Sequence, residues 1–170
     1  TVLWSQKMKA WPGPPATADF DGDGLQEFAV SLGDRLVLID GDGTELWSTP
    51  TDAPPGLEGP TTWDIDLDGV PEVIIADEEI LRVLEGTTGN PVIQITDHAS
   101  TTMIETPAVA DIDGDGQGEI VFGSGPCLHN PCNWVGVRAL GSADGDWPWA
   151  RPVYNQHAYW GGNIADDLSV

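Results

Sequence analysis

Short apolar runs, bounded by Gly, Pro and Asp, recur along the whole chain and determine its predicted secondary structure. The clearest runs come in two sets of three, at 28–30, 73–75 and 120–122, and at 36–39, 80–84 and 135–140. Their length, β-branched content and flanking turn residues favour buried strands over helices. The 21 Gly and 14 Pro leave few windows for long helices. The pattern therefore predicts an all-β protein.

An acidic segment precedes each run of the first set and shows that the chain contains a repeat. These segments share the pattern Asp-x-Asp-x-Asp-Gly-x-x-Glu and occupy residues 19–27, 64–72 and 111–119. A proline lies four residues before each of them, and a Gly-containing turn with a last short strand closes each unit, at 43–47, 89–93 and 145–149. Four strands in about 45 residues, repeated in tandem, is the arithmetic of a β-propeller blade.

The repeat register divides the chain into three whole units and two incomplete ones. Leu3-Trp4-Ser5 aligns with Leu46-Trp47-Ser48, which predicts an outermost strand at the N-terminus, and 163–166 aligns as the innermost strand of a fourth unit. The predicted divisions are an outer strand in 1–10, blades at 11–50, 51–98 and 99–152, and a crossing segment with an inner strand in 153–170. Three blades plus an orphan strand at each end are fewer than a ring normally uses. We expect a longer chain, or other copies or chains, to complete the ring.

These residues resemble a known family of repeats. The three acidic loops between first and second strands are similar to the calcium-binding FG-GAP/VCBS repeats of integrin-like propellers and of many secreted bacterial proteins. The resemblance covers about residues 11 to 150, and the family's Gly-Ala-Pro landmark is partly present in Gly13-Pro14-Pro15 and Gly59-Pro60. It implies a β-propeller stabilised by calcium.

The loops carry the oxygen ligands that calcium prefers, with carboxylates at positions 1, 3, 5 and 9 and a backbone carbonyl at position 7. The three predicted Ca²⁺ sites comprise Asp19, Asp21, Asp23, Leu25 and Glu27; Asp64, Asp66, Asp68, Val70 and Glu72; and Asp111, Asp113, Asp115, Gln117 and Glu119. An EF-hand is excluded because position 12 is apolar in every loop. Magnesium fits less well, since it prefers rigid octahedral sites that keep several waters. The alternative is that the loops are solvated Asp-Gly turns.

Charge narrows the range of partners. The chain has 28 Asp and Glu against 6 Lys and Arg, a net charge of -22, yet 40% of its residues are hydrophobic. This apolar content predicts a folded protein. The negative charge argues against nucleic acid and anionic membranes as partners. No apolar run approaches the roughly 20 residues of a membrane span, and the N-terminus lacks a signal-peptide layout, so we expect no direct membrane insertion.

The two cysteines lie in an insertion of the third unit. Val135 follows the loop glutamate by sixteen residues, whereas Leu36 and Leu81 follow theirs by nine. Cys127 and Cys132 flank a turn-forming stretch within it, which favours a disulfide and hence an extracellular or cell-surface location. A thiolate metal site with His129 is the alternative, although its ligand set is incomplete.

No catalytic constellation emerges, so we expect a non-enzymatic protein. His98, His129 and His157 lie in no nucleophile or metalloprotease motif. Trp4, Trp47 and Trp149 share a repeat position and are expected to pack between blades, and Trp63 to be buried. The candidate ligand or interface residues are Trp134, Tyr154, His157, Tyr159 and Trp160. The last four lie in a tail that serves equally well as the crossing to the next blade.

The sequence thus predicts a calcium-stabilised extracellular propeller module for binding, adhesion or assembly, with a protein or carbohydrate ligand. Two alternatives stay open. One is part of a secreted propeller enzyme that acts on polysaccharide, and the other is an architectural subunit that polymerises through its end strands. The fold alone does not identify the ligand.

Overall fold

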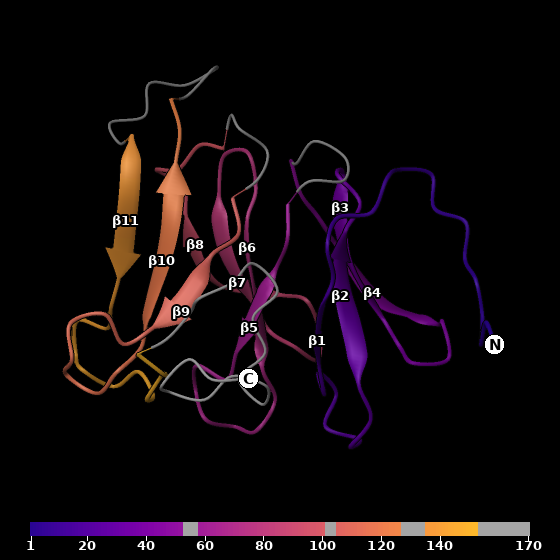
Figure 1. Ribbon diagram of the computed structural model, residues 1–170, viewed down its shortest axis with the longest axis horizontal. Coiled ribbons are helices and arrows are strands. Elements are labelled where there is room, and N and C mark those ends of the chain that lie inside the picture. Colours follow the sequence, from indigo (N-terminus) through magenta and orange to yellow (C-terminus); the bar gives the residue numbers. More distant parts are fainter. Residues whose placement is uncertain (53–57, 101–104, 127–134, 153–170) are drawn as a thin grey trace.

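A computed structural model describes residues 1–52, 58–100, 105–126 and 135–152. These residues form eleven strands in three antiparallel sheets and no helix (Figure 1). Accordingly, no helix in the described ranges is long and apolar enough to cross a membrane. The predicted all-β class is confirmed, and the predicted apolar runs coincide with strands of the three sheets except for Ile80 and Val135, each one residue before a strand.

Each sheet follows the order of the chain. The first contains β1 (Ala16–Ala18), β2 (Glu27–Ser31), β3 (Arg35–Ile39) and β4 (Glu45–Pro50). The second contains β5 (Thr61–Trp63), β6 (Glu72–Ala76), β7 (Leu81–Leu84) and β8 (Pro91–Ile95). The third contains β9 (Ala108–Ala110), β10 (Glu119–Ser124) and β11 (Gly136–Leu140).

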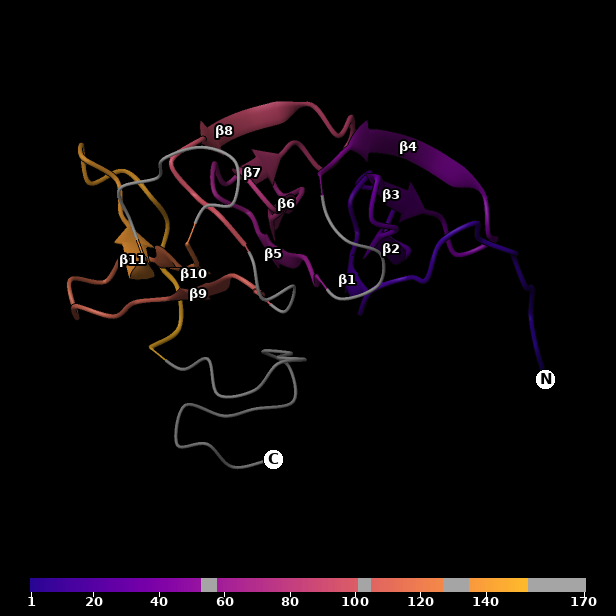
Figure 2. The same ribbon diagram turned by 90° about the horizontal axis from the view of Figure 1, so that it is seen from above.

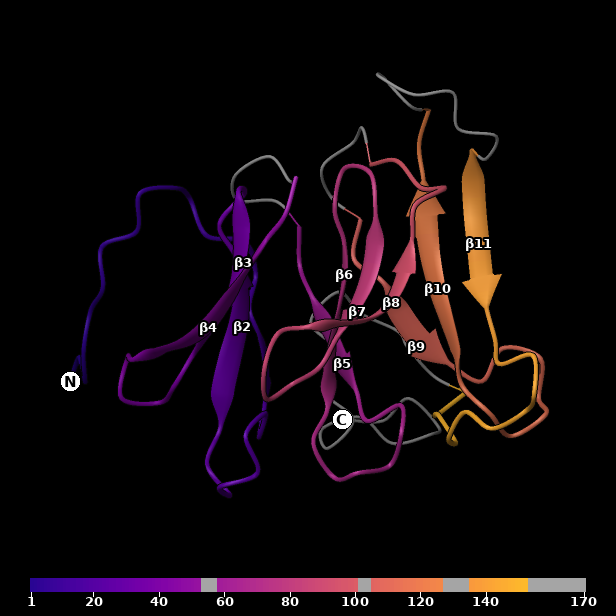
Figure 3. The ribbon, with the colours of Figure 1, turned by 180° about the vertical axis from the view of Figure 1, so that it is seen from behind.

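The three sheets stand side by side. Seen from above, β1, β5 and β9 lie on one side of the row, and β4 and β8 lie on the opposite side (Figure 2). β5 contacts both β1 and β9, so the three sheets meet one another through their short first strands on this inner side. The loops that join β1 to β2, β5 to β6 and β9 to β10 all lie at the same end of the sheets (Figure 3).

Two apolar cores join neighbouring sheets, because the second and third strands of each unit are apolar on both faces. The core between the first and second sheets contains Phe20, Ala29, Leu36, Leu38, Val73, Ile75 and Leu84. The core between the second and third contains Ile65, Ile74, Ala76, Leu81, Val83, Ile120 and Phe122. Alternate residues of β6 therefore point to different cores, which explains why its five residues are all buried.

The predicted strand at the N-terminus is wrong, since residues 1–10 form no strand. No described strand lies alongside them to complete a hydrogen-bonded ladder. Trp4 nevertheless packs against the first sheet. Its ring stacks on Phe28 with centroids 5.6 Å apart, and its indole N–H donates to the Gly41 carbonyl at 2.7 Å. Trp47 repeats this contact one unit later by donating to Gly86 at 2.8 Å.

The predicted last strand of the third unit is also wrong, because residues 145–149 form no strand. Pro148 has no N–H to contribute to a ladder. Its carbonyl accepts a hydrogen bond from the Gly118 N–H at 2.9 Å, which holds the segment against the third acidic loop. Trp149 is 61% exposed, so no described unit covers it, and its packing between blades stays a prediction.

The register within the third sheet differs from the expected one by two residues. Leu36 pairs with Ser31 and Leu81 with Ala76, and the partner at the equivalent position of β10, Gly123, pairs with Val137 and not with Val135. The insertion is therefore two residues longer than the repeat spacing indicated.

Candidate metal centres

The three acidic segments form equivalent loops at one end of the sheets. Loop 1 (19–27) joins β1 to β2, loop 2 (64–72) joins β5 to β6, and loop 3 (111–119) joins β9 to β10. In each loop the first aspartate directly follows the last residue of the sheet's first strand, and the glutamate is the first residue of its second strand. The sheet thus fixes both ends of every loop.

One hydrogen-bond scheme recurs in the loops. The aspartate at position 1 accepts the N–H of position 6, at 2.9 Å from Gly24, 3.2 Å from Gly69 and 3.1 Å from Gly116. The aspartate at position 3 accepts the N–H of position 5 at 3.1 Å in every loop. The glutamate at position 9 accepts the N–H of position 2, at 2.7, 2.8 and 2.9 Å in loops 1, 2 and 3. The carboxylates therefore hold the loop backbone in a turn by accepting its N–H groups.

This fold requires left-handed backbone at positions 4 and 6. The position-6 glycines have φ values of 90°, 94° and 92°. Position 4 is Gly22 in loop 1 and Gly114 in loop 3, but Leu67 in loop 2, with φ at 62°. A Cβ disfavours this conformation, so Leu67 introduces strain that the glycines avoid. The repeat pattern includes the glycine at position 6 but leaves position 4 undefined, so the requirement at position 4 is visible only in the structure.

We expect Leu67→Gly to stabilise the protein. Leu67 is 70% exposed, so little packing is lost, and relief of the left-handed strain is worth about 0.5–1 kcal/mol after the added freedom of the unfolded glycine. The melting temperature, followed by circular dichroism, should rise by about 1–4 °C. The matched control is Leu25→Gly, an exposed leucine of loop 1 outside the left-handed region, which should lower it. A lower value for Leu67→Gly would contradict the assignment of strain.

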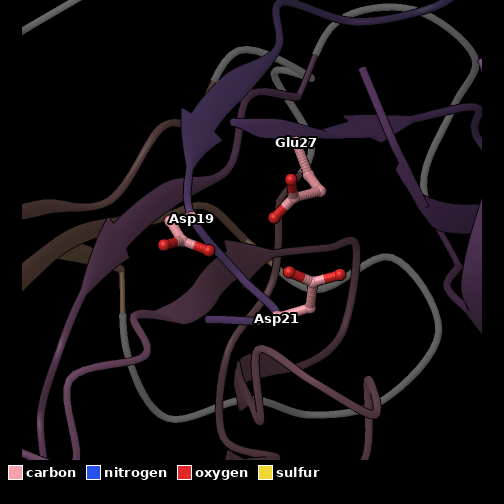
Figure 4. Close-up of side chains that lie close together, drawn as sticks. All are labelled: Asp19, Asp21 and Glu27. Atoms are coloured by element: carbon pink, nitrogen blue, oxygen red, sulfur yellow. The ribbon is translucent and has the colours of Figure 1, made fainter. Parts of the chain in front are cut away.

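Carboxylate oxygens converge in every loop, but the set differs between loops. Oxygens within 4.8 Å of one another come from Asp19, Asp21 and Glu27; from Asp64, Asp66 and Glu72; and from Asp111, Asp113 and Asp115. Figure 4 shows the side chains of the first set pointing toward one another. The predicted ligands Asp23, Asp68 and Glu119 lie outside these groups. The predicted carbonyl ligands Leu25, Val70 and Gln117 belong to the same loops, and each donates its N–H to the position-5 aspartate.

The glutamate of loop 2 is a buried carboxylate whose charge is not fully compensated. Glu72 is almost fully buried, and its Oε1 atom has no hydrogen-bond partner among the described residues. Burial raises the pKa of Glu72 to about 7, an effect that the Ile65 N–H partly offsets. Burial likewise raises the pKa of Glu27 in loop 1. A buried carboxylate without a counter-charge is costly, and a bound cation removes that cost.

The donor set fits a hard cation that takes flexible oxygen coordination. Each loop supplies three converging carboxylates, and Asp64 Oδ1 of loop 2 is a further buried oxygen without a hydrogen-bond partner among the described residues. No His or Cys takes part in these groups. Calcium takes six to eight oxygens at flexible angles, whereas zinc favours nitrogen and sulfur. The residues present therefore fit calcium.

The loops also contact the neighbouring sheets. Gly86, in the turn after β7, has no room for a side chain, because a Cβ there would lie 2.3 Å from the Pro71 carbonyl of loop 2 and 3.3 Å from the Phe20 carbonyl of loop 1. A Cβ on Gly22 would lie 3.6 Å from the Val70 side chain. Loops 1 and 2 are therefore neighbours, and ordering either one supports the packing between sheets.

Several predicted residues do not join this site. Trp63 is half-buried and packs edge-on against Trp147, with ring centroids 5.6 Å apart. The predicted disulfide and ligand residues lie outside the described residues, namely Cys127, Cys132, Trp134, Tyr154, His157, Tyr159 and Trp160. The predicted inner strand at 163–166 also lies outside them.

Sequence reasoning missed a second group of buried ionisable side chains. Glu58, Asp77 and His98 are 0–2% exposed, and they lie at the end of the sheets opposite loops 1 to 3. His98 lies in no catalytic motif, so the sequence does not mark it. The available signal was weak, because only the position of Glu58 two residues before the repeat proline, shared with Glu105, marks it out.

Comparisons with known proteins agree with the repeat. Residues 64–122 match the model of the FG-GAP-like repeat family. Among solved structures the chain is similar to the V. cholerae biofilm matrix protein Bap1, with a TM-score of 0.74 and 24% sequence identity. The similarity covers 85% of this chain and 24% of Bap1, so the chain spans about a quarter of that protein's length. A search of curated proteins gave no match.

Proposed function

We propose that the chain is a calcium-stabilised segment of an extracellular β-propeller that serves as a non-catalytic adhesion module. The observation that carries this proposal is the acidic loop itself, repeated three times with one hydrogen-bond scheme and converging carboxylates. The side-by-side sheets with short inner strands are compatible with propeller blades. Each Ca²⁺ holds the first and second strands of its sheet together and lowers the repulsion within the loop.

The proposed role and location draw on the comparisons and on the charge. Bap1 is described as a biofilm matrix protein, which supports an extracellular adhesion role. The match to the FG-GAP-like repeat family supports the same role. Millimolar calcium outside cells would fill sites of moderate affinity. The ligand class that we propose is a protein or carbohydrate, since a net charge of -22 repels nucleic acid and anionic lipid.

Binding without turnover tests this proposal. The chain, immobilised through a terminal tag, is exposed to neutral and acidic polysaccharides and to extracellular matrix proteins in calcium and in chelator. Saturable, calcium-dependent retention with no change in polysaccharide length supports an adhesion module. Depolymerisation of any polysaccharide, seen as new reducing ends or unsaturated products, would instead support the enzyme alternative.

A specific observation favours assembly as a second candidate function. The outer face of the third sheet is apolar and uncovered in the described structure, and Ile112, Val137 and Trp149 are 56%, 78% and 61% exposed. Their counterparts in the earlier units are buried, since Phe20 and Ile65 match Ile112, and Leu36 and Leu81 match Val137. A further repeat unit, from the same protein or from another copy, is the natural occupant of this face.

We expect Val137→Lys to weaken any assembly formed through this face. A charge in the middle of a buried apolar contact costs several kcal/mol, which is enough to dissociate a micromolar complex. Light scattering in millimolar calcium measures the change as a lower mass. Val92→Lys is the matched control, because Val92 is an exposed valine on β8 and should leave the mass unchanged. A monomeric parent chain, or equal masses for parent and Val137→Lys, would contradict assembly through this face.

A further inference from the structure

A second group of acidic side chains lies at the end of the sheets opposite the calcium loops. Glu58 comes shortly before β5, Asp77 directly follows β6, and Glu105 comes shortly before β9. Loop 2 joins β5 and β6 at the other end of the same strands (Figure 3). The length of the sheet therefore separates this group from the loop sites, and no loop carboxylate belongs to it.

Glu58 and Glu105 occupy the same position in their repeats. Each lies two residues before a repeat proline, and Gly13 holds the equivalent position in the first unit. A Cβ on Gly13 would lie 2.4 Å from the Glu58 carbonyl oxygen, so no side chain fits there. The glycine of the first unit thus allows the backbone of the second unit to pack closely against it. The carboxylates of Glu58 and Glu105 come from the second and third units.

Glu58 is a buried carboxylate without local compensation. It is 0% exposed, and neither of its carboxylate oxygens accepts a hydrogen bond from the described residues. The Thr106 Oγ1 atom is also buried and has no hydrogen-bond partner among the described residues. A Cβ added to Gly59, the residue after Glu58, would lie 3.2 Å from this atom. The Ser100 hydroxyl donates to Glu105 Oε2 and also lies beside Glu58. Glu58, Ser100 and Glu105 are therefore neighbours, and the buried Thr106 hydroxyl lies beside the backbone that follows Glu58.

The surrounding charges do not neutralise Glu58. Burial first, and then the negative charges of Asp77, Glu105 and Glu78, raise the pKa of Glu58 to about 8, which the Ser100 hydroxyl only partly offsets. The Arg82 guanidinium is paired with Asp77 at 2.9 Å.

The other basic side chains near the group, Arg138 and His98, do not supply a positive charge to Glu58 either. Arg138 donates to the Asp97 carbonyl, and its guanidinium lies over the Phe122 ring at 5.6 Å. His98 is buried against the same ring, and burial, aided by Arg138, lowers its pKa, although Asp77 and Glu105 oppose this. The histidine is therefore neutral at pH 7 and supplies no positive charge.

We propose that Glu58, Ser100, Glu105 and Thr106 form a further cation site, separate in position and sequence from the loops, for one hard divalent cation such as Ca²⁺. Two carboxylates and two hydroxyls supply only oxygen, which is the donor type that Ca²⁺ prefers and zinc does not. A cation between the carboxylates compensates the buried charge of Glu58 and bridges the second and third units through equivalent residues. The site does not rest on calcium binding by the loops.

Calorimetric titration of the metal-free chain with CaCl₂ tests the site. The parent chain should bind one more Ca²⁺ than Glu58→Gln, whatever the number of loop sites that fill. Glu79→Gln, on the same loop as Asp77 and not among the groups that face Glu58, is the matched control.

A second variant keeps the test decisive if Glu58→Gln disturbs the fold. Thr106→Val preserves the shape of the side chain and removes one oxygen, so it should weaken the added site at least about tenfold while every loop site is retained. Equal stoichiometry in the parent and Glu58→Gln chains, or unchanged affinities in Thr106→Val, would overturn the site. If the loops bind no calcium, the parent should still bind one ion and Glu58→Gln none, so failure of the proposed function is distinguishable.

Discussion

Removal of calcium should lower the melting temperature of this protein by at least about 15 °C. A ligand at a concentration one hundred times its Kd stabilises the folded state by about 2.7 kcal/mol, so three loop sites together contribute about 8 kcal/mol. For a chain of this length each kcal/mol shifts the melting temperature by about 2–4 °C. Circular dichroism melts in millimolar calcium and in chelator measure the difference.

Two controls separate bound calcium from screening of the charge. The 28 acidic residues repel one another, and any salt weakens that repulsion. Sodium chloride at equal ionic strength should therefore restore only a small part of the lost stability, and magnesium should restore less than calcium because it needs stricter octahedral geometry. Equal melting temperatures in calcium and in chelator would contradict a structural role for the metal.

In chelator, Glu58→Gln should raise the stability of the chain at pH 8. The pKa of Glu58 is raised to about 8, above its ordinary value near 4.5. Below pH 4.5 the group is protonated in both states and contributes no difference. As the pH rises to about 8, the unfolded chain loses this proton while the folded chain holds it, so folding becomes less favourable. Removing the group should gain about 4 kcal/mol at pH 8 and little at pH 4.5.

Melting temperatures of the parent and Glu58→Gln chains at these two pH values provide the test. The difference should be about 8–16 °C at pH 8 and small at pH 4.5. Glu79→Gln removes one negative charge from the same part of the fold and should show no such pH-dependent gain. A parent chain that is as stable as Glu58→Gln at pH 8 in chelator would show that the buried carboxyl carries no penalty. In calcium the order of the two chains should reverse, because the added cation site needs Glu58.

The repeat made much of the fold predictable from sequence. The acidic pattern fixed the three loops, and the apolar runs after them identified β2, β6 and β10 because strands buried on both faces need continuous apolar residues. Trp47 was assigned to packing between units from its register alone, and its contact with Gly86 of the second sheet agrees with that assignment. Local patterns succeed here because each unit repeats the same solution.

The errors arise where a local pattern depends on a neighbour. Residues 3–5 have the sequence of a strand but lack a described partner, and Pro148 interrupts the strand expected at 145–149. In loop 3 the converging oxygens include that of Asp115 and exclude that of Glu119, unlike in the other two loops. The spacing of the residues is the same in all three loops, so it does not predict this difference. The buried group around Glu58 unites residues that are tens of positions apart in sequence, so only the three-dimensional fold reveals it.

Crystals of the chain grown in millimolar calcium would show most directly whether the loops are metal sites. Anomalous diffraction should reveal a peak in each loop, between Asp19, Asp21 and Glu27, between Asp64, Asp66 and Glu72, and between Asp111, Asp113 and Asp115. Oxygens should surround each peak at about 2.3–2.6 Å, the distances typical of calcium. Ordered loops without anomalous peaks would contradict calcium binding by the repeat.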